Sequence, residues 1–346
     1  MNHQADKKFI LLTCCLALLT VVTVIISTGM GFMSIDSLDI FRVIGAKLFA
    51  SPDLVKEIDA SISYVIMDVR LPRILTAALV GAGLAISGVI YQGILLNPLA
   101  DPYTLGISSG AAFGASLALL ANLSLLGQFS TPLFAFIGAI ATLIVVMRLS
   151  TFNGQISAQT LILSGVIVGA ILSAGISFLK YLADEQVAII IFWLMGSFAS
   201  ATWNGVALVA ITLGFGLSIT FYYARDLNIM SLGRRSSDSL GVETAKIRKI
   251  LLLSASFVTA ICVAVTGIIG FIGLIVPHLM RYLVGPDNRK LLPASAFAGA
   301  ILLLLADTLT RAVLPVEVPI GVLTALIGGP FFCIIFRQKQ KGRSYE

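Results

Sequence analysis

Long apolar runs separated by short polar stretches make up most of this chain, and their lengths predict a membrane protein. A helix needs about 20 apolar residues, within a range of about 17–25, to cross the hydrocarbon core of a bilayer. Ten runs are candidates, at residues 9–30, 71–91, 104–125, 130–149, 159–182, 205–224, 249–266, 268–284, 292–311 and 319–336. We therefore expect an all-α, polytopic membrane protein with about ten transmembrane helices, folded as a single transmembrane domain over residues 1–346.

A shorter apolar piece, residues 187–199, has only 13 residues and is predicted to be an outer half-helix or a re-entrant segment. The positive charges support this prediction. With ten spans and a cytoplasmic N-terminus, 16 of the 23 lysines and arginines lie on the inner side. A crossing at 187–199 would move 13 of them outside, against the positive-inside rule. Both termini are therefore expected to be cytoplasmic.

The N-terminus superficially resembles a secretory signal peptide, because Lys7 and Lys8 precede an apolar run from Phe9 to Ile26. That run is too long for the apolar region of a signal peptide, and no A-x-A cleavage site follows it. We interpret it as an uncleaved first span.

Between the first two spans, residues 34–49 have apolar side chains at helical spacing. Acidic residues lie in the first turn and a lysine lies in the last, which suits the helix dipole. The pattern predicts an amphipathic helix at the outer membrane surface or a simple connecting helix. Its apolar positions are Ile35, Leu38, Phe41, Ile44 and Leu48.

Two sets of regularly spaced glycines predict close helix packing, because small residues let helix backbones approach in lipid. Gly106, Gly110 and Gly114 are four residues apart in the third span, where they could face a pathway or a neighbouring helix. In the stretch from Gly267 to Arg281, three glycines recur at intervals of three and are expected on one side of a helix. Pro277 and His278 are expected to interrupt that helix, and His278 to be a packed or capping residue. The three glycines are Gly267, Gly270 and Gly273.

The composition agrees with an integral membrane protein, since 58% of the residues are hydrophobic, 12% are charged and the mean hydropathy is +1.01. Average soluble domains have about 45–50% apolar residues. The four cysteines, at positions 14, 15, 262 and 333, all lie in apolar runs. They indicate packing residues rather than a disulfide framework or a metal cluster.

Enzymatic chemistry finds no support in the sequence. The chain has two histidines, His3 and His278, so no histidine-based metal site or catalytic triad can be assembled. No G-x-x-x-x-G-K-[ST] phosphate-binding loop occurs. We therefore expect no catalytic residue, no metal and no bound cofactor in this chain. Any ATP must be hydrolysed by a partner.

An ion-coupled secondary transporter is the main alternative class, and such proteins usually need intramembrane acids or broken helices. The only acid well inside a predicted span is Asp307, and Arg311 lies one helical turn later. An acid and a base four residues apart can satisfy each other on one helix. This leaves no free proton carrier, so the alternative is disfavoured.

Residues 225–249 form the longest polar stretch predicted on the inner side. Two Leu-Gly steps, Leu232-Gly233 and Leu240-Gly241, are eight residues apart and have polar and apolar residues between them. Glycine commonly ends helices, so the pattern predicts two short cytoplasmic helices with glycine C-caps. The element could dock a partner or could be a basic loop that anchors the inner face.

The loop from Asn97 to Pro102 joins the second and third spans on the inner side. Pro98 and Pro102 disfavour helix at the residues that precede them and keep the loop tight. From the residues alone, a plain turn explains this loop.

Several sequence blocks together resemble the FecCD-type permeases, the membrane subunits of ABC importers for ferric siderophores, haem and cobalamin. The stretch from Gly267 to Arg281 resembles a signature of that family. The blocks occur in the family's order and cover about nine tenths of the chain. The others are R-L-P-R at 70–73, N-P-L-A-D-P at 97–102, L-G-I-S-S-G-A at 105–111, W-L-M-G-S at 193–197, the two Leu-Gly steps, L-L-A-D-T-L-T-R at 304–311 and V-P-I-G-V-L-T-A at 318–325.

The resemblance implies roles for residues at the inner side. In these permeases the stretch that matches 225–249 fits a groove in the ATPase subunit, and the loop between the second and third spans helps to close the inner mouth of the pathway. The implied inner-gate residues are Asn97 and Leu99. The implied coupling residues are Ser231, Leu232, Gly233, Leu240 and Gly241.

At the outer side, the resemblance implies that Arg70, Arg73 and Arg311 receive one glutamate from each lobe of a binding protein. The planar guanidinium can bond a carboxylate with two parallel hydrogen bonds, which fixes orientation. The alternative is that these arginines are snorkelling anchors at the membrane surface.

The resemblance also implies an assembly. We expect a homodimer with the pathway at its two-fold axis, two ATP-binding subunits that use ATP, and an extracytoplasmic substrate-binding protein. Membrane lipid surrounds the dimer, and no nucleic acid partner is implied. The expected location is the cytoplasmic (inner) membrane of a bacterium or archaeon. The expected substrate is an iron complex, either a ferric siderophore or haem, with cobalamin as the alternative.

Overall fold

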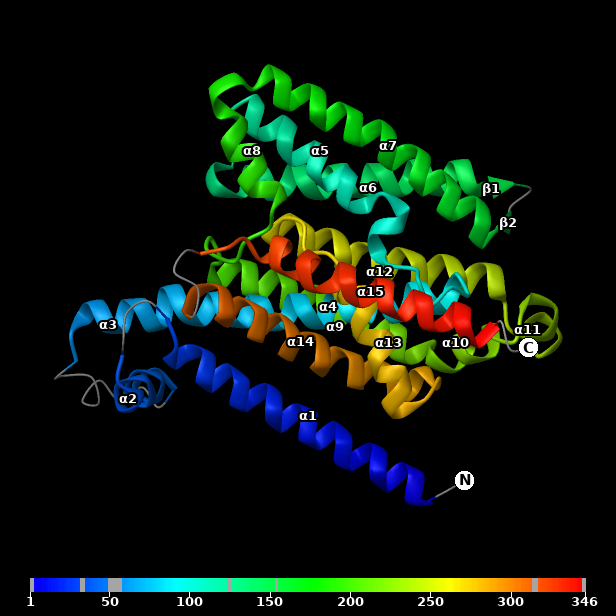
Figure 1. Ribbon diagram of the computed structural model, residues 1–346, viewed down its shortest axis with the longest axis horizontal. Helices are drawn as coiled ribbons and strands as arrows, with labels where there is room; N and C mark the ends of the chain where they lie inside the picture. Colours follow the sequence, from blue (N-terminus) through cyan, green and yellow to red (C-terminus); the bar gives the residue numbers. More distant parts are fainter. Residues whose placement is uncertain are drawn as a thin grey trace.

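The computed structural model describes residues 3–31, 35–48, 58–123, 126–152, 155–312 and 317–343 (Figure 1). Within these ranges the chain is helical apart from one short ladder between β1 (Thr151–Phe152) and β2 (Gln155–Ile156). The helices are α1 (His3–Gly29), α2 (Ser37–Leu48), α3 (Ala60–Tyr64), π-helix η2 (Val65–Arg70), α4 (Leu71–Ile94), η3 (Pro102–Leu105), α5 (Ile107–Leu120), η4 (Gly127–Phe129), α6 (Ser130–Ser150), α7 (Ala158–Leu182), η5 (Asp184–Gln186), α8 (Val187–Leu194), α9 (Trp203–Tyr222), α10 (Ala224–Met230), α11 (Arg234–Ser239), α12 (Thr244–Thr266), α13 (Ile272–Val284), α14 (Asn288–Ala312) and α15 (Ile320–Arg343).

The predicted all-α, polytopic fold is confirmed. Among the described residues, seven helices are long and apolar enough to cross a membrane, and three shorter apolar helices lie at Ile107–Leu120, Ile272–Val284 and Ile320–Ile334. Together they fall on the ten predicted spans. Helix α8 has eight residues, so it rises about 12 Å, well short of the roughly 30 Å hydrocarbon core. The prediction that 187–199 forms only a half-helix is therefore correct.

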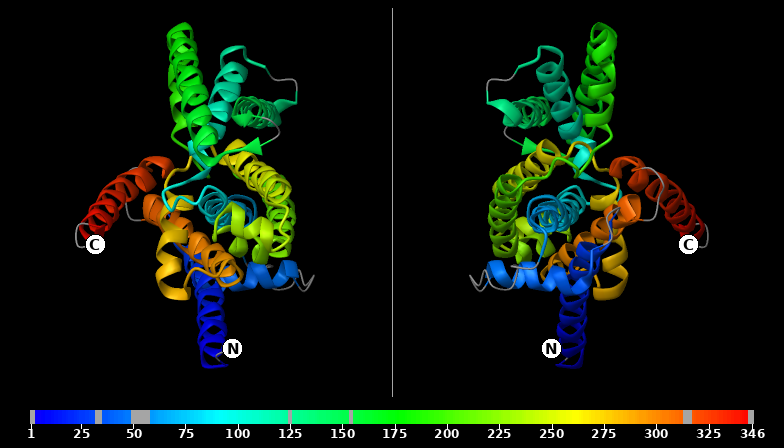
Figure 2. Two further views of the ribbon diagram at one scale, coloured as in Figure 1. Left: turned by 90° about the vertical axis from the view of Figure 1, so that its right-hand side faces the viewer. Right: turned by 90° about the vertical axis from the view of Figure 1, so that its left-hand side faces the viewer.

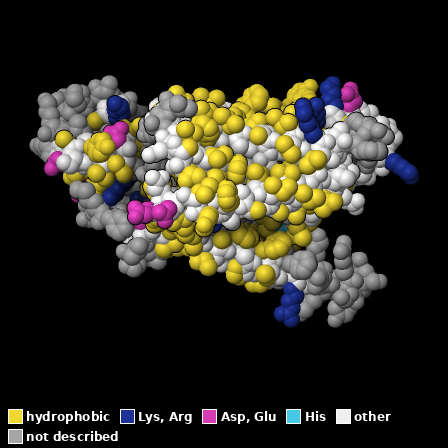
Figure 3. Space-filling view, turned by 90° about the horizontal axis from the view of Figure 1, so that it is seen from above, with side chains coloured by type: hydrophobic (Ala, Val, Ile, Leu, Met, Phe, Trp, Pro, Cys, Tyr) yellow, Lys and Arg dark blue, Asp and Glu magenta, His cyan; other side chains and the backbone are white. Residues whose placement is uncertain are grey.

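On the face that Figure 3 shows, apolar side chains cover the middle of the molecule and charged side chains gather toward its two ends. Helix α1 illustrates the first feature, because only 6% of its most apolar window is buried inside the structure. This is the distribution that lipid around the middle and water at the ends require.

Helix α4 is the centre of the fold, where α9, α12, α13 and α14 surround it (Figure 2). In its most apolar window 83% of the residues are buried. Small residues permit this packing: a Cβ added to Gly81 would lie 2.3 Å from the carbonyl oxygen of Gly299 in α14. Without side chains at these positions, the two backbones touch.

The glycines of the third predicted span pack within the chain. A Cβ at Gly110 would lie 2.5 Å from the carbonyl oxygen of Gly138, and one at Gly114 would lie 2.1 Å from that of Phe134, both in α6. These contacts favour helix packing over a pathway wall. Gly106 is not on the same face, because it has φ +73° and precedes α5. The predicted span 104–125 is consequently broken, and its helix covers only Ile107–Leu120.

The prediction that Gly267, Gly270 and Gly273 line one side of a helix is wrong. Gly267 ends α12 with φ +73°, and α13 begins only at Ile272, so the intervening segment is not helical. A Cβ on Gly270 would meet open space. Only Gly273 packs on a helix face, where a Cβ would lie 2.8 Å from the carbonyl oxygen of Leu84 in α4.

Pro277 does not interrupt α13, contrary to prediction. Proline has no N–H, so the carbonyl of Gly273, four residues earlier, lacks its helical donor. The Nε2 atom of Gln92 lies 3.4 Å from that oxygen and 3.3 Å from the carbonyl oxygen of Leu274. Helix α4 thereby supplies a replacement donor, and α13 continues to Val284.

The ring of His278 in α13 packs edge-on against Tyr282, with 5.1 Å between the ring centroids. His278 is partly buried. Its position therefore agrees with the prediction of a packed residue.

Helix α2 exists as predicted, and its apolar side chains have two environments. Ile35, Ile40 and Val43 are buried against Ile66 of the π-helix, and Ile44 packs against the same group. Two other residues of the predicted face, Leu38 and Phe41, are exposed, with exposed fractions of 55% and 59%. The predicted apolar face therefore packs within the chain in part, and α2 is apolar on a second side as well.

Candidate functional site

A cluster of ionised residues lies where the N-terminal end of α4 and the C-terminal end of α14 meet. The structure brings together Arg70, at the end of π-helix η2, Arg73, in the first turn of α4, and Arg311, near the end of α14. A residue of another helix bonds the wide turn of the π-helix: the indole N–H of Trp203 in α9 donates to the carbonyl oxygen of Met67 at 3.0 Å.

Asp307 is the centre of this cluster and is 1% exposed. Its Oδ1 accepts from Arg73 Nη2 at 2.8 Å and from Arg73 Nε at 3.0 Å, and its Oδ2 accepts from Arg311 Nε at 3.3 Å. The Asp307–Arg311 pair expected from the sequence is therefore present. The sequence did not reveal the second pair, with Arg73, because 234 residues separate the partners.

Arg70 and Arg311 bind the C-terminal end of α1. Arg70 Nη1 donates to the carbonyl oxygen of Thr28 at 2.8 Å, and the guanidinium of Arg311 donates to the carbonyl oxygens of Ser27 and Met30. The last carbonyls of a helix lack helical donors and carry partial negative charge, so two buried cations stabilise them. Each arginine is 5% exposed, which identifies both as internal caps of α1.

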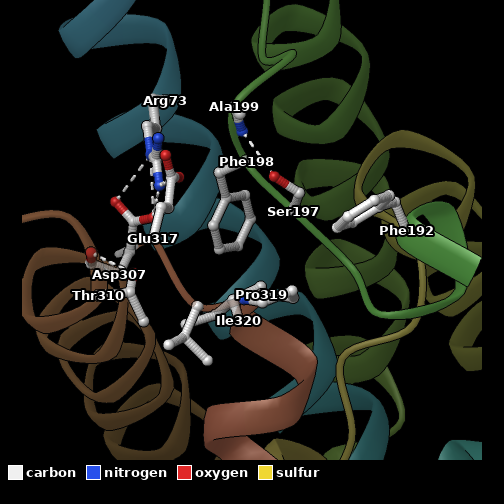
Figure 4. A pocket seen from close by; sticks show the side chains of 11 residues that line it. Arg73, Phe192, Ser197, Phe198, Ala199, Asp307, Thr310, Glu317, Pro319 and Ile320 are labelled. Atoms are coloured by element: carbon white, nitrogen blue, oxygen red, sulfur yellow. Dashed lines mark hydrogen bonds and ion pairs between the residues drawn. The ribbon is translucent and has the colours of Figure 1, made fainter. Parts of the chain in front are cut away.

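Arg73 faces a cavity and has a second acidic partner, Glu317. Its Nη2 lies 2.5 Å from Glu317 Oε1, and the Glu317 side chain is 38% exposed. The cavity has a volume of about 250 Å³. Figure 4 shows the Arg73, Asp307 and Glu317 group on one side and apolar side chains, Phe192, Phe198, Pro319 and Ile320, on the other. Nothing in the sequence pattern indicated Glu317.

The five predicted coupling residues lie at the opposite end of the molecule, in the turns that follow α10 and α11 (Figure 1). Gly233 has φ +90° and Gly241 has φ +80°, so both use backbone conformations that other residues adopt with strain. The N–H of Val242 donates to the carbonyl oxygen of Ser237 at 3.1 Å, which closes α11 after Gly241. The predicted pair of short helices is confirmed, but only one of the two predicted glycine C-caps is present. Gly241 directly follows the end of α11, whereas the C-cap of α10 is Ser231 and Gly233 is the N-cap residue of α11.

Two large apolar side chains are exposed in this polar region. Leu232 is 63% exposed and Leu240 is 61% exposed, each beside one of the two glycines. Ser231 is also exposed, and its hydroxyl donates to the carbonyl oxygen of Asn228 at 2.6 Å. Both exposed leucines therefore directly precede glycines whose backbone conformations other residues adopt only with strain.

Asn97 and Leu99 lie in the turn between α4 and η3, and both are half-buried. The Asn97 side-chain oxygen accepts the N–H of Leu99 at 3.0 Å, while the Asn97 N–H donates to the carbonyl oxygen of Gln92 at 3.2 Å. These bonds account for a tight turn. The gate role stays a prediction.

The fold and these two ends define a polytopic, all-α membrane protein with an ion cluster at one end and a structured polar element at the other. The chain belongs to the FecCD transport family, whose profile matches residues 18–338. It is an ABC importer permease of that family, as the sequence blocks indicated.

Three comparisons illustrate the range of the relatives. The molybdate import system permease protein MolB of Haemophilus influenzae is 42% identical over 334 residues, which are 96% of each chain. The hemin transport system permease protein HmuU of Yersinia pestis is 41% identical over 284 residues, 80% of this chain and 85% of HmuU. A solved structure described as an inward-facing metal-chelate type ABC transporter matches with a TM-score of 0.81 and 38% identity, covering 94% of this chain and 98% of that one.

Proposed function

We propose that the chain is the permease subunit of an importer that brings an iron complex, a ferric siderophore or haem, across a bacterial or archaeal cytoplasmic membrane. The number of relatives named for iron complexes carries the proposal, and the hemin permease, which matches over 80% of this chain, is one of them. The permease performs no covalent chemistry on the substrate. Two copies enclose a pathway, two ATPase subunits bind below, and a binding protein delivers substrate from outside. Molybdate is the second candidate, because the molybdate relative matches 96% of both chains. Cobalamin is the third.

The substrate is tested with the permease, its ATPase and its binding protein reconstituted in liposomes. Uptake is measured for radiolabelled ferric siderophore, haem, cobalamin and molybdate, with ATP and without it. We expect ATP-dependent uptake of the ferric siderophore or haem only. Uptake of molybdate or cobalamin alone would replace the iron assignment, and no ATP-dependent uptake of any of them would contradict the proposal.

The proposed orientation has both termini in the cytoplasm and the half-helix α8 outside. Ser200, after α8, and Ser236, in α11, are both exposed. In a cysteine-free background, single cysteines at these positions should label from opposite sides of the membrane with an impermeant maleimide. Labelling of both from one side would contradict the ten-span arrangement.

The ATPase subunits are proposed to dock on the surface formed by Leu232, Leu240 and the adjoining turns. Replacing Gly241 by valine is expected to weaken docking about tenfold, because a left-handed conformation costs a residue with a Cβ about 1–2 kcal/mol. A Cβ there would meet open space, so strain rather than a clash causes the effect. ATPase retained on purification of the Gly241→Val permease measures the docking.

The control is Gly241→Asn, because asparagine tolerates the left-handed conformation. This variant should keep most of the bound ATPase. Full ATPase retention by Gly241→Val, with the permease folded, would count against docking at this element.

Docking of the binding protein is proposed to centre on Arg73, since Arg70 and Arg311 already cap α1. Glu317 then occupies the position that a partner carboxylate needs. Neutralising it with Glu317→Gln is expected to raise the affinity for the binding protein up to about fivefold, because exposed ion pairs contribute about 0.2–1 kcal/mol. Binding is measured by surface plasmon resonance at low and high salt.

The matched control is Glu185→Gln, which removes the same charge from another exposed outer position. It should leave affinity nearly unchanged at high salt, where long-range effects are screened. Equal gains in both variants would show a general charge effect and would contradict a role for the Arg73–Glu317 pair.

A further inference from the structure

Asn228 connects α10, the first short helix of the proposed coupling element (residues 225–249), to the N-terminus of α14. Its Oδ1 accepts both the backbone N–H and the side-chain Nδ2 of Asn288, each at 2.8 Å. Its Nδ2 donates to Asp287 Oδ1 at 2.6 Å. The Asn228 side-chain amide therefore donates to Asp287 and accepts from Asn288, two consecutive residues outside the coupling element. These bonds fix the position of α14 relative to α10.

Helix α14 extends from this contact to the ion cluster at the other end of the molecule. Its 25 residues rise about 37 Å, and its far end carries Asp307 and Arg311. Because the Gly81 and Gly299 backbones touch, α14 cannot slide along α4 without a clash. The two helices therefore form one rigid unit. Because α4 carries Arg73, the ion cluster lies at the outer end of this unit.

The apolar contacts of α10 are of a different kind. Leu227 packs against α4 so closely that a Cβ on Gly93 would lie 2.8 Å from Leu227 Cδ1. Such a contact resists movement of the two helices toward each other. It includes no directional bond that would resist their separation. The Asn228 hydrogen bonds also resist separation and rotation, since they weaken steeply when distance or angle changes.

We propose that Asn228 is the positioning residue that transmits movement of the coupling element to α14, and through the α4–α14 unit to the outer ion cluster. The inference rests on the proposed docking of ATPase subunits at the coupling element. It identifies the residue through which ATP binding below and binding-protein release above are linked.

The test replaces Asn228 with aspartate in the permease–ATPase complex reconstituted with its binding protein. The introduced carboxylate faces Asp287, so like charges replace a hydrogen bond. We expect the ratio of binding-protein-stimulated to unstimulated ATP hydrolysis to fall toward one and substrate uptake to drop at least tenfold. Adding Asp287→Asn should restore the stimulation ratio and the uptake, because the amide at position 287 can donate to the carboxylate at position 228. In the unaltered chain the N–H of Arg289 donates to Asp287 Oδ1 at 3.0 Å, and the amide oxygen of the Asp287→Asn variant can still accept this bond.

Thr151→Val is the control. It removes a hydroxyl that donates to the carbonyl oxygen of Met147 at 2.6 Å, on the same side of the membrane but outside the coupling element. It should leave the stimulation ratio unchanged. If Asn228→Asp misfolds, Asn228→Ala provides the same reading.

Normal stimulation and uptake in a folded Asn228 variant would overturn the inference. A lower melting temperature in Asn228→Asp and Asn228→Ala, together with no rescue of Asn228→Asp by Asp287→Asn, would also overturn it. The two levels remain distinguishable. If Gly241→Val uncouples the complex but Asn228→Asp does not, only this inference fails. If Gly241→Val keeps its ATPase fully bound and coupled, the docking proposal itself fails.

Discussion

Replacing Asp307 with alanine is expected to destabilise the permease by about 3–5 kcal/mol, the usual cost of removing one partner from a buried ion pair. The carboxylate is 1% exposed and bonds two arginines, Arg73 and Arg311. Without it, two cations remain close together in a region of low dielectric constant. Glu317 still pairs with Arg73, but Arg311 has only the carbonyls of α1 among the partners described above.

The effect is measured as the melting temperature in detergent and as the yield of monodisperse protein. Glu317→Ala is the matched control, because it removes the exposed carboxylate from the same Arg73 and should cost at most about 1 kcal/mol. A similar drop in melting temperature in Asp307→Ala and Glu317→Ala would show that burial of Asp307 is not the reason for its contribution to stability.

Replacing Gly88 with alanine is expected to abolish most of the folded permease. The added Cβ would lie 1.8 Å from the carbonyl oxygen of Gly273 and 2.7 Å from its Cα, and backbone atoms cannot rotate away as a side chain can. Overpacking a core usually costs about 1–3 kcal/mol, and this contact belongs above that range. Separation of α4 from α13 would also move Gln92 away from the carbonyl that Pro277 leaves without a donor.

The comparison is Gly214→Ala, on membrane helix α9, where an added Cβ meets nothing within 4 Å. Alanine favours a helix over glycine by about 0.8–1 kcal/mol, so this variant should be neutral or slightly more stable. Fluorescence-detected gel filtration of fusion proteins measures both variants. A monodisperse Gly88→Ala protein with an unchanged melting temperature would contradict the close α4–α13 packing.

The sequence by itself determined the fold class, the approximate places of the ten spans and the short length of α8. These features depend on run length, because hydrocarbon of fixed thickness requires about 20 apolar residues whatever their partners are. The helix α11 within residues 225–249 was also predictable, since Gly241 ends it through its own backbone conformation. The pair of Asp307 and Arg311 followed in the same way from spacing on one helix.

Tertiary structure alone decided where apolar runs break and which buried charges meet. The run after Gly267 looks continuous, yet α13 starts at Ile272 and passes through Pro277, because Gln92 from a distant helix bonds the carbonyl that proline leaves unsatisfied. Likewise, Arg70 and Arg311 are caps of α1 only because folding brings its carbonyl end to them. In a bilayer every exposed backbone group needs a partner, and residues far away in the sequence supply it. Local pattern therefore fixes the helices, whereas their ends depend on the assembled bundle.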